Sequence, residues 1–134
     1  MRVVLDTSAV IHLLERKHDA LVAELRKASE PPSISVVTLG ELAAGWSSHE
    51  PDSPRHRTYS AARRLRVVNI VADSFAQGPS GLIRCFGDCR AVGIKGNDAW
   101  IAATARATES TLVTYDETLA ARYATIGNST LMSL

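Results

Sequence analysis

Four acidic residues lie at the ends of predicted strands or on the packing faces of predicted helices. They are Asp6, Glu41, Asp98 and Asp116. Carboxylates turned away from water need a compensating partner, because burial and mutual repulsion disfavour their charged forms. No histidine or cysteine stands at ligand spacing beside them, and ligation by oxygen alone favours Mg²⁺ or Mn²⁺ over zinc. The pattern therefore predicts a divalent-cation site built from acids that are far apart in the chain.

Each of these acids also has a purely structural explanation. Asp6 could form a turn after a strand, and Asp98 and Asp116 could each cap the amino end of a helix. Glu41 could complete a capping box with Thr38. No single acid therefore distinguishes a cation site from a purely structural role.

The helix faces on which two of the acids lie favour the shared site. At three- and four-residue spacing Glu41 has the small, mostly apolar neighbours Val37, Thr38, Ala44 and Gly45. Asp98 shares its face with Ile101, Ala102 and Ala105. Residues at these spacings lie on one side of a helix, so both carboxylates are predicted to point toward packed neighbours rather than toward water.

Elements that position these acids follow from the hydrophobic pattern. Apolar runs predict strands at residues 2–5, 33–36, 67–71 and 111–115, and an edge strand at 130–132. Helices are predicted directly after Asp6, at 19–28, from Thr38 through Trp46, and at 55–66, 82–92, 99–108 and 117–123. A further helix, capped by Ser74 with Gln77, is predicted to break near Gly78 and Pro79. Strands that alternate with helices indicate crossover connections, and hence a parallel sheet with helices on both faces.

Two of the acids directly follow predicted strands. Asp6 ends the first strand, where Thr7 or Ser8 is expected to cap the next helix, and Asp116 follows the strand at 111–115. Functional groups of such sheets gather beyond the carboxyl ends of the strands, near the point where the strand order reverses. Asp6 and Asp116 are therefore expected at that point.

Length and composition predict one ordinary globular domain spanning residues 1–134. The chain is 46% hydrophobic and 22% charged, which excludes a disordered or low-complexity protein. Fifteen basic and fourteen acidic residues give a net charge of +1, so any affinity for nucleic acid must come from local clusters. The stretches without charged residues fall far short of the roughly 18 residues that a membrane span needs. At the amino end Asp6 follows only three apolar residues, too few for the apolar region of a secretory signal, so a cytoplasmic protein is expected.

The two cysteines are also consistent with a cytoplasmic protein. Cys85 and Cys89 stand four residues apart without a second pair of ligands nearby, so a structural zinc site is not expected. We expect reduced thiols packed in the core.

Three segments resemble a known protein family. They are VVLDTSAVI at residues 3–11, SVVTLGELAAG at 35–45 and IKGNDAWIAATARATESTLVTYDETLA at 94–120. These segments look like the PIN-domain nucleases and, more narrowly, like the VapC-type toxins of bacterial toxin-antitoxin pairs. The order of the acids, Asp, Glu, Asp and Asp, matches over nearly the whole chain.

This resemblance implies a three-layer α/β/α sandwich and a metal-dependent endoribonuclease that leaves 5′-phosphate and 3′-hydroxyl ends. It assigns Asp6, Glu41, Asp98 and Asp116 as the catalytic and metal-binding residues for Mg²⁺ or Mn²⁺, with Thr114 as a supporting hydroxyl. It also implies an RNA substrate, an inhibitory VapB-type antitoxin, and a homodimer without membrane attachment. Leu39, Leu42 and Trp46 could contribute to the dimer interface, although core burial explains them equally well.

A basic segment offers a candidate RNA contact. Residues 54–72 contain no acid and five arginines, namely Arg55, Arg57, Arg63, Arg64 and Arg66. Arginine side chains bind phosphates, with an affinity that falls as salt rises. The first four are the candidate substrate-binding residues, and a solvated helix face is the alternative.

Other function classes fit less well. A haloacid dehalogenase-type phosphatase needs a second aspartate two residues after the first, where this chain has Ser8. A receiver-like phosphoacceptor needs an acceptor aspartate after an internal strand and a later lysine that ends a strand, and Lys95 does not stand in that position. A non-catalytic PIN-like scaffold that binds RNA or protein remains an alternative, although such a scaffold would usually lack part of the acid set.

Overall fold

The computed structural model describes residues 2–16, 19–47, 51–68, 81–127 and 129–134. The strands are β1 (Val3–Leu5), β2 (Ser33–Ser35), β3 (Arg66–Val68), β4 (Thr111–Thr114) and β5 (Leu131–Ser133). The helices are α1 (Thr7–Ile11), which continues as the π-helical turn η1 (His12–Arg16), then α2 (Asp19–Arg26), α3 (Val36–Ser47), α4 (Pro54–Ala62), α6 (Leu82–Ala91), α7 (Gly96–Ala107) and α8 (Glu117–Tyr123). Among the described residues, no helix is long and apolar enough to cross a membrane.

The strands form one parallel sheet in the order β3-β2-β1-β4-β5. Successive strands run outward from β1 through β2 to β3, and the chain then returns to the other side of β1 to add β4 and β5. The strand order therefore reverses between β1 and β4, where Leu5 is paired with Val113. The predicted parallel α/β architecture is confirmed, and the reversal lies beside the two acids that follow β1 and β4.

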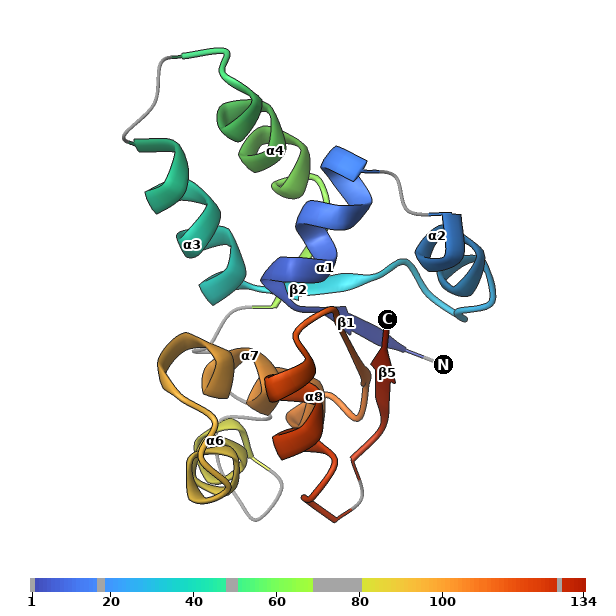
Figure 1. Ribbon diagram of the computed structural model, residues 1–134, viewed down its shortest axis with the longest axis vertical. Coiled ribbons are helices and arrows are strands. Elements are labelled where there is room, and N and C mark those ends of the chain that lie inside the picture. Colours follow the sequence, from blue (N-terminus) through green and yellow to red (C-terminus); the bar gives the residue numbers. More distant parts are fainter. Residues whose placement is uncertain (1, 17–18, 48–50, 69–80, 128) are drawn as a thin grey trace.

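Helices cover both faces of the sheet, which gives the three expected layers (Figure 1). Helices α1, α2, α3 and α4 lie on one side and α6, α7 and α8 on the other. Alternate residues of the central strands feed the two cores: Val3, Leu5 and Val113 face the first group of helices, and Val4 and Leu112 the second. Every residue of β1 and β4 is buried, as expected for the central strands of a parallel sheet, and β1 is accordingly apolar throughout.

Helix α7 is nearly enclosed by protein. Its small residues allow close approach to the sheet, and five consecutive positions from Ile101 to Ala105 are at most 1% exposed. The helix contacts α6, α3, β1, β2 and β4. Asp98 is thereby carried on a rigid, closely packed element.

Most predicted elements are present, with shifted boundaries. Helix α4 ends at Ala62, so the predicted helix over 55–66 is too long, and Arg66 belongs to β3 instead. The end of the predicted strand at 67–71 and the predicted helix start at Ser74 lie outside the described residues. The edge strand is β5, displaced by one residue from the prediction.

Three predictions about helix caps are wrong. Asp6 itself caps α1 by accepting a hydrogen bond from the amide of Ala9, in place of Thr7 or Ser8. Helix α3 begins at Val36, so Thr38 lies inside its first turn and is buried, and no capping box with Glu41 forms. Asp98 lies inside the first turn of α7, whose N-cap is Lys95.

The residues considered for a dimer interface have packing partners within the chain. Leu42 is 7% exposed, and Leu39 packs against the same core. Trp46 stacks on His56 and Tyr59 of α4. Cys85 and Cys89 are buried free thiols, as predicted.

Candidate functional site

Asp6 stands at the carboxyl end of β1 and is almost completely buried, with 3% of its surface exposed. One carboxylate oxygen accepts hydrogen bonds from Ser8 Oγ at 2.7 Å and from the amide of Ala9 at 2.8 Å. The other accepts a short hydrogen bond from the hydroxyl of Thr114. Burial raises the pKa of Asp6, while these three donors oppose the shift by stabilising the carboxylate. Asp6 is thus held in one orientation from several directions.

Thr114 ends β4 and connects two of the predicted acids. Its buried hydroxyl donates to Asp6 and accepts a hydrogen bond from the amide of Asp116 at 2.9 Å. The supporting position assigned to Thr114 by resemblance therefore has a physical basis. The hydroxyl couples the end of β1 to the turn that leads into α8.

Asp116 caps helix α8 and is exposed. Its carboxylate accepts hydrogen bonds from the amides of Thr118 at 2.9 Å and of Leu119 at 3.0 Å. The structural explanation of this residue as a helix cap is therefore correct. Both bonds use the same oxygen, Oδ1, so the capping role leaves the second oxygen for another contact.

Glu41 comes from the second turn of α3 and is half-buried. Thr7 Oγ1 donates a 2.6 Å hydrogen bond to Glu41 Oε1 and lies 3.3 Å from Thr38 Oγ1. Thr7 immediately follows Asp6, so the first turn after β1 contacts two of the four predicted acids. The hydrogen bond between Thr7 and Glu41 was not predicted from the sequence, because Thr7 was expected only to cap a helix.

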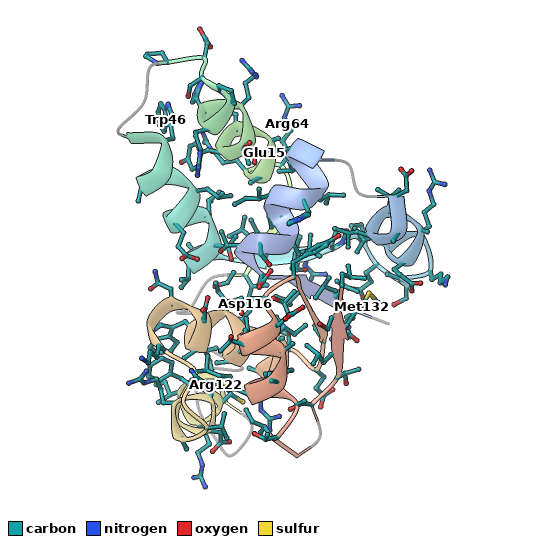
Figure 2. All side chains as sticks on the ribbon, viewed as in Figure 1. Glu15, Trp46, Arg64, Asp116, Arg122 and Met132 are labelled. Carbon is teal, nitrogen blue, oxygen red and sulfur yellow. The ribbon has the colours of Figure 1, made fainter. Side chains whose placement is uncertain are left out.

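Asp98 completes the set from the first turn of α7. Burial is the main cause that raises its pKa, to about 6, and the nearby charges of Glu41, Asp116 and Asp6 add to the shift. The other three predicted acids are therefore close enough to Asp98 to act on its charge. Four elements separated in sequence bring them to one end of the sheet, and Figure 2 shows Asp116 at the centre of the molecule, where the two helical layers meet.

Two hollows open beside the acids. The smaller has a volume of about 130 Å³ and is lined by Asp98, Asp116, Thr118, Lys95 and Arg122, among others. The larger, of about 510 Å³, is lined by Val37, Gly40, Glu41, Ala44 and Asn97. Lys95 and Arg122 bring positive charge to the hollow that holds two of the acids. Neither residue was predicted from the sequence to lie near the site. Only the fold brings these two residues together.

The acids suit an oxygen-preferring divalent cation in chemistry and charge. Among the residues that the structure describes, no three acidic, histidine or cysteine side chains converge closely enough to enclose one ion. Mg²⁺, however, is commonly held by one or two carboxylates, with water in its remaining positions. The mutual repulsion expressed in the raised pKa of Asp98 is what a bound cation would relieve. The donor set therefore fits a hydrated Mg²⁺ or Mn²⁺.

The basic segment lies apart from the acids. Arg55, Arg57, Arg63 and Arg64 are all exposed on α4 or the turn after it. Figure 2 places Arg64 on the arm formed by α3 and α4, away from Asp116. Arg66 instead forms an ion pair with Glu30, at 3.0 Å, at the opposite end of the sheet. A contact between this segment and RNA would thus lie at some distance from the acids.

Comparison with protein families gives one match, to the family model of the PIN domain, over residues 3–124. No curated protein matches the sequence significantly. The family match spans all four acids and Thr114.

Solved structures resemble the chain over nearly its whole length. A chain of VapBC2 from Rickettsia felis, solved bound to a DNA fragment from its promoter, is 22% identical with a TM-score of 0.77, over 100% of this chain and 99% of that one. A chain of VapBC-1 from nontypeable Haemophilus influenzae is 18% identical with a TM-score of 0.74, over 99% and 98% of the two chains. A chain of VapBC-5, from a family of toxin-antitoxin systems in Mycobacterium tuberculosis, is 22% identical with a TM-score of 0.69, over 100% of both. At these identities the likeness establishes the shared fold.

Proposed function

The chain belongs to the PIN-domain family, and from this premise we propose that it is a metal-dependent endoribonuclease acting as the toxin of a toxin-antitoxin pair. The observation that carries the proposal is the gathering of Asp6, Glu41, Asp98 and Asp116 at one end of the sheet, where burial, together with the charges of the other three acids, raises the pKa of Asp98 to about 6. A carboxyl group whose pKa is strongly shifted by burial and by neighbouring charges is a candidate for a functional site, and a bound cation would relieve the repulsion among these acids.

Hydrolysis of a phosphodiester needs an activated water and neutralisation of charge on the phosphate and the leaving oxygen. A bound Mg²⁺ or Mn²⁺ supplies both, by acidifying water and by acting as a Lewis acid. In this proposal Asp6, Glu41, Asp98 and Asp116 hold the cation, one or two of them as direct ligands and the others through its bound waters. The hydroxyls of Ser8 and Thr114 keep Asp6 oriented and favour its charged form. No side chain of the protein has to act as a nucleophile.

RNA must approach a strongly acidic centre, so positive groups nearby would help to bind it. Lys95 and Arg122 line the hollow that contains Asp98 and Asp116, and in this proposal they contact phosphates next to the scissile one. The arginines of α4 would contact the RNA backbone farther away. The expected products carry 5′-phosphate and 3′-hydroxyl ends.

An inhibitory VapB-type antitoxin is proposed as the partner. The VapBC complexes that share this fold support it, because each pairs a chain of this fold with a partner protein. An arginine of the antitoxin could pair with the acids in a charge-assisted contact and compete with the cation. Copurification with the product of a gene adjacent to this one would test the partnership.

A homodimer is proposed for the free toxin. Light scattering on the purified chain distinguishes a mass near 14.4 kDa from one twice as large. A mass near the lower value at micromolar concentration would contradict the dimer and leave the nuclease proposal unaffected.

The nuclease activity is tested by incubating total cellular RNA with the purified chain and Mg²⁺ or Mn²⁺. The comparison lanes contain a chelator or the Asp98→Asn variant. We expect cleavage with either cation, and loss of cleavage by at least about 100-fold in both comparison lanes, since catalytic metal sites contribute several kcal/mol to the transition state. Sequencing of the fragment ends would then identify the target.

Two results would contradict the proposal. Full metal-dependent cleavage by Asp98→Asn would mean that the acids are wrongly assigned. An absence of cleavage, together with an absence of cation binding, would favour the alternative of a non-catalytic PIN-like scaffold that binds RNA or protein.

A further inference from the structure

Thr7 is the first residue of α1 and makes the shortest contact to Glu41 among those described above. Its Oγ1 lies 2.6 Å from Glu41 Oε1, across a separation of 34 residues in sequence. The bond joins α1 to α3, the helix that carries Glu41 on the other wall of the site. A hydroxyl that bonds to a carboxylate at this distance makes a strong, charge-assisted hydrogen bond.

The surroundings of Thr7 direct its proton toward the carboxylate. A hydroxyl has one proton to donate and two lone pairs to accept with. Glu41 Oε1, at 2.6 Å, is a nearer and stronger acceptor than the Thr38 hydroxyl at 3.3 Å, so the single proton of Thr7 goes to the carboxylate. Thr38 is 0% exposed and its helix is packed against α7, so water does not reach the Thr38 hydroxyl.

Glu41 needs such support more than the aspartates of the site do. Its side chain has one more rotatable bond than aspartate, and a half-buried glutamate loses conformational freedom when it is fixed. Asp6 is fixed by Ser8, Ala9 and Thr114, and Asp116 by the amides that it caps. The bond from Thr7 fixes one oxygen of Glu41 and leaves Oε2 for a ligand or for water.

We propose that Thr7 is a positioning residue that fixes the Glu41 carboxylate and thereby makes the acidic site selective for Mg²⁺. The inference rests on the proposed function and adds a determinant of cation choice to it. Mg²⁺ demands near-ideal octahedral geometry with short ligand distances, whereas Ca²⁺ accepts six to eight oxygen ligands in flexible arrangements. A glutamate that swings freely therefore weakens Mg²⁺ binding more than Ca²⁺ binding.

The test measures binding of Mg²⁺ and of Ca²⁺ to the intact chain by calorimetry, for the wild type, Thr7→Val and Thr7→Ser. Valine keeps the shape of threonine without the hydroxyl, and serine keeps the hydroxyl. We expect Thr7→Val to weaken Mg²⁺ binding about 10- to 100-fold, the usual effect of losing a group that orients a metal ligand. The Ca²⁺ affinity falls several-fold less, and Thr7→Ser retains both affinities within about twofold.

A matched control is provided elsewhere in the chain. Thr58 Oγ1 on α4 donates a 2.8 Å hydrogen bond to Glu15 Oε1 on η1, so it also joins a threonine to a glutamate of a distant element. Thr58→Val removes a comparable bond outside the acidic site. We expect a similar change in melting temperature for Thr58→Val and Thr7→Val, but unchanged cation binding for Thr58→Val.

Each outcome decides one of the two proposals. Unchanged Mg²⁺ affinity in Thr7→Val, equal weakening of both cations, or an equal effect of Thr58→Val would overturn the role of Thr7 and leave the nuclease proposal intact. A wild-type chain that binds neither cation would refute the proposed function itself, and the role of Thr7 with it.

Discussion

Among single residues, Asp98 is the acid whose titration most directly reports the state of the site. Its pKa of about 6 lies above the ordinary value of 3.8 because of burial and three neighbouring acids. At a pH between 3.8 and about 6, Asp98 is therefore more often protonated in the folded chain than in the unfolded chain. The contribution of Asp98 to the unfolding free energy therefore falls as the pH rises from about 4 to about 6, and stays low above that.

Asp98→Asn should accordingly stabilise the protein in the presence of a chelator. We expect its melting temperature to exceed that of the wild type by a few degrees at pH 7.5, because no charge is buried at this position and repulsion with the other acids is removed, and by little at pH 4. Addition of Mg²⁺ should stabilise the wild type more than the variant, since only the wild type keeps all its ligands. The measurement is differential scanning fluorimetry across this pH range.

Glu109→Gln is the control for that experiment. Glu109 is exposed and lies just before β4, at the opposite end of the sheet, so its neutralisation should not change the pH profile. A profile of Asp98→Asn that also parallels the wild type would contradict the repulsion deduced for Asp98.

Thr114 is the second informative residue, because its buried hydroxyl serves Asp6 and Asp116 together. Thr114→Val removes a donor from a buried carboxylate while conserving shape, and the loss of such a partner costs about 1–3 kcal/mol. We expect a decrease of that size in the unfolding free energy from urea titration. Thr111→Val, in the same strand, should have a smaller effect, and equal losses would show that the hydroxyl of Thr114 has no special role.

At the scale of elements, the arm formed by α3 and α4 is held together by aromatic stacking. The ring centroids of Trp46 lie 4.5 Å from His56 and 5.5 Å from Tyr59, and the guanidinium of Arg63 lies 5.8 Å from the Tyr59 ring. The arm presents the exposed arginines of α4 on a defined surface, although that surface is apart from the acids. Its effect on RNA should therefore be on affinity rather than on the chemical step.

Replacement of Arg63 and Arg64 by Gln tests this surface. In the Asp98→Asn background, which does not cleave, the logarithmic salt dependence of RNA binding should become shallower by about 0.7 for each lost phosphate contact. Fluorescence anisotropy with a single-stranded RNA measures the slope. Arg84→Gln, on α6, is the control, because it removes one exposed charge elsewhere on the molecule. If Arg84→Gln changed the slope as much as the loss of one arginine from the arm does, the arm would have no specific contact with RNA.

At the scale of the whole molecule, the two thiols report how firmly α6 is packed. Cys85 and Cys89 are buried against α7, and burial raises the pKa of both, to about 12 for Cys89. Thiolates are the reactive form, so the native protein should react with a thiol reagent at least about 100-fold more slowly than the unfolded chain. Ala91→Cys, exposed on the same helix, should react at once. Rapid labelling of the native thiols would show that α6 opens locally.

The sequence by itself determined the fold class and the position of two acids directly after the central strands. Continuous apolar runs that alternate with helical segments require a parallel sheet covered on both faces, and the acids that follow β1 and β4 then share one end of it. Local patterns carry this information, because strand burial and crossover connections depend on residues close in the chain.

Helix starts were harder to predict, because a hydroxyl that follows a strand has several uses. Thr7 and Ser8 looked like caps, yet Asp6 takes the cap, and their hydroxyls bond to Glu41 and Asp6 instead. Thr38 and Glu41 fit a capping box in spacing, but the helix begins two residues earlier. A side chain chooses among competing partners by their distance and charge, and only the packed structure sets these.

Tertiary structure alone decided which groups surround the acids. Sheet order brings Lys95 and Arg122 to the hollow beside Asp98 and Asp116, and the packing of α1 against α3 brings Thr7 to Glu41. The raised pKa of Asp98 likewise depends on burial and on charges from three other elements. Distances across the fold follow from how helices pack on the sheet, so long-range contacts of this kind leave no mark on local sequence.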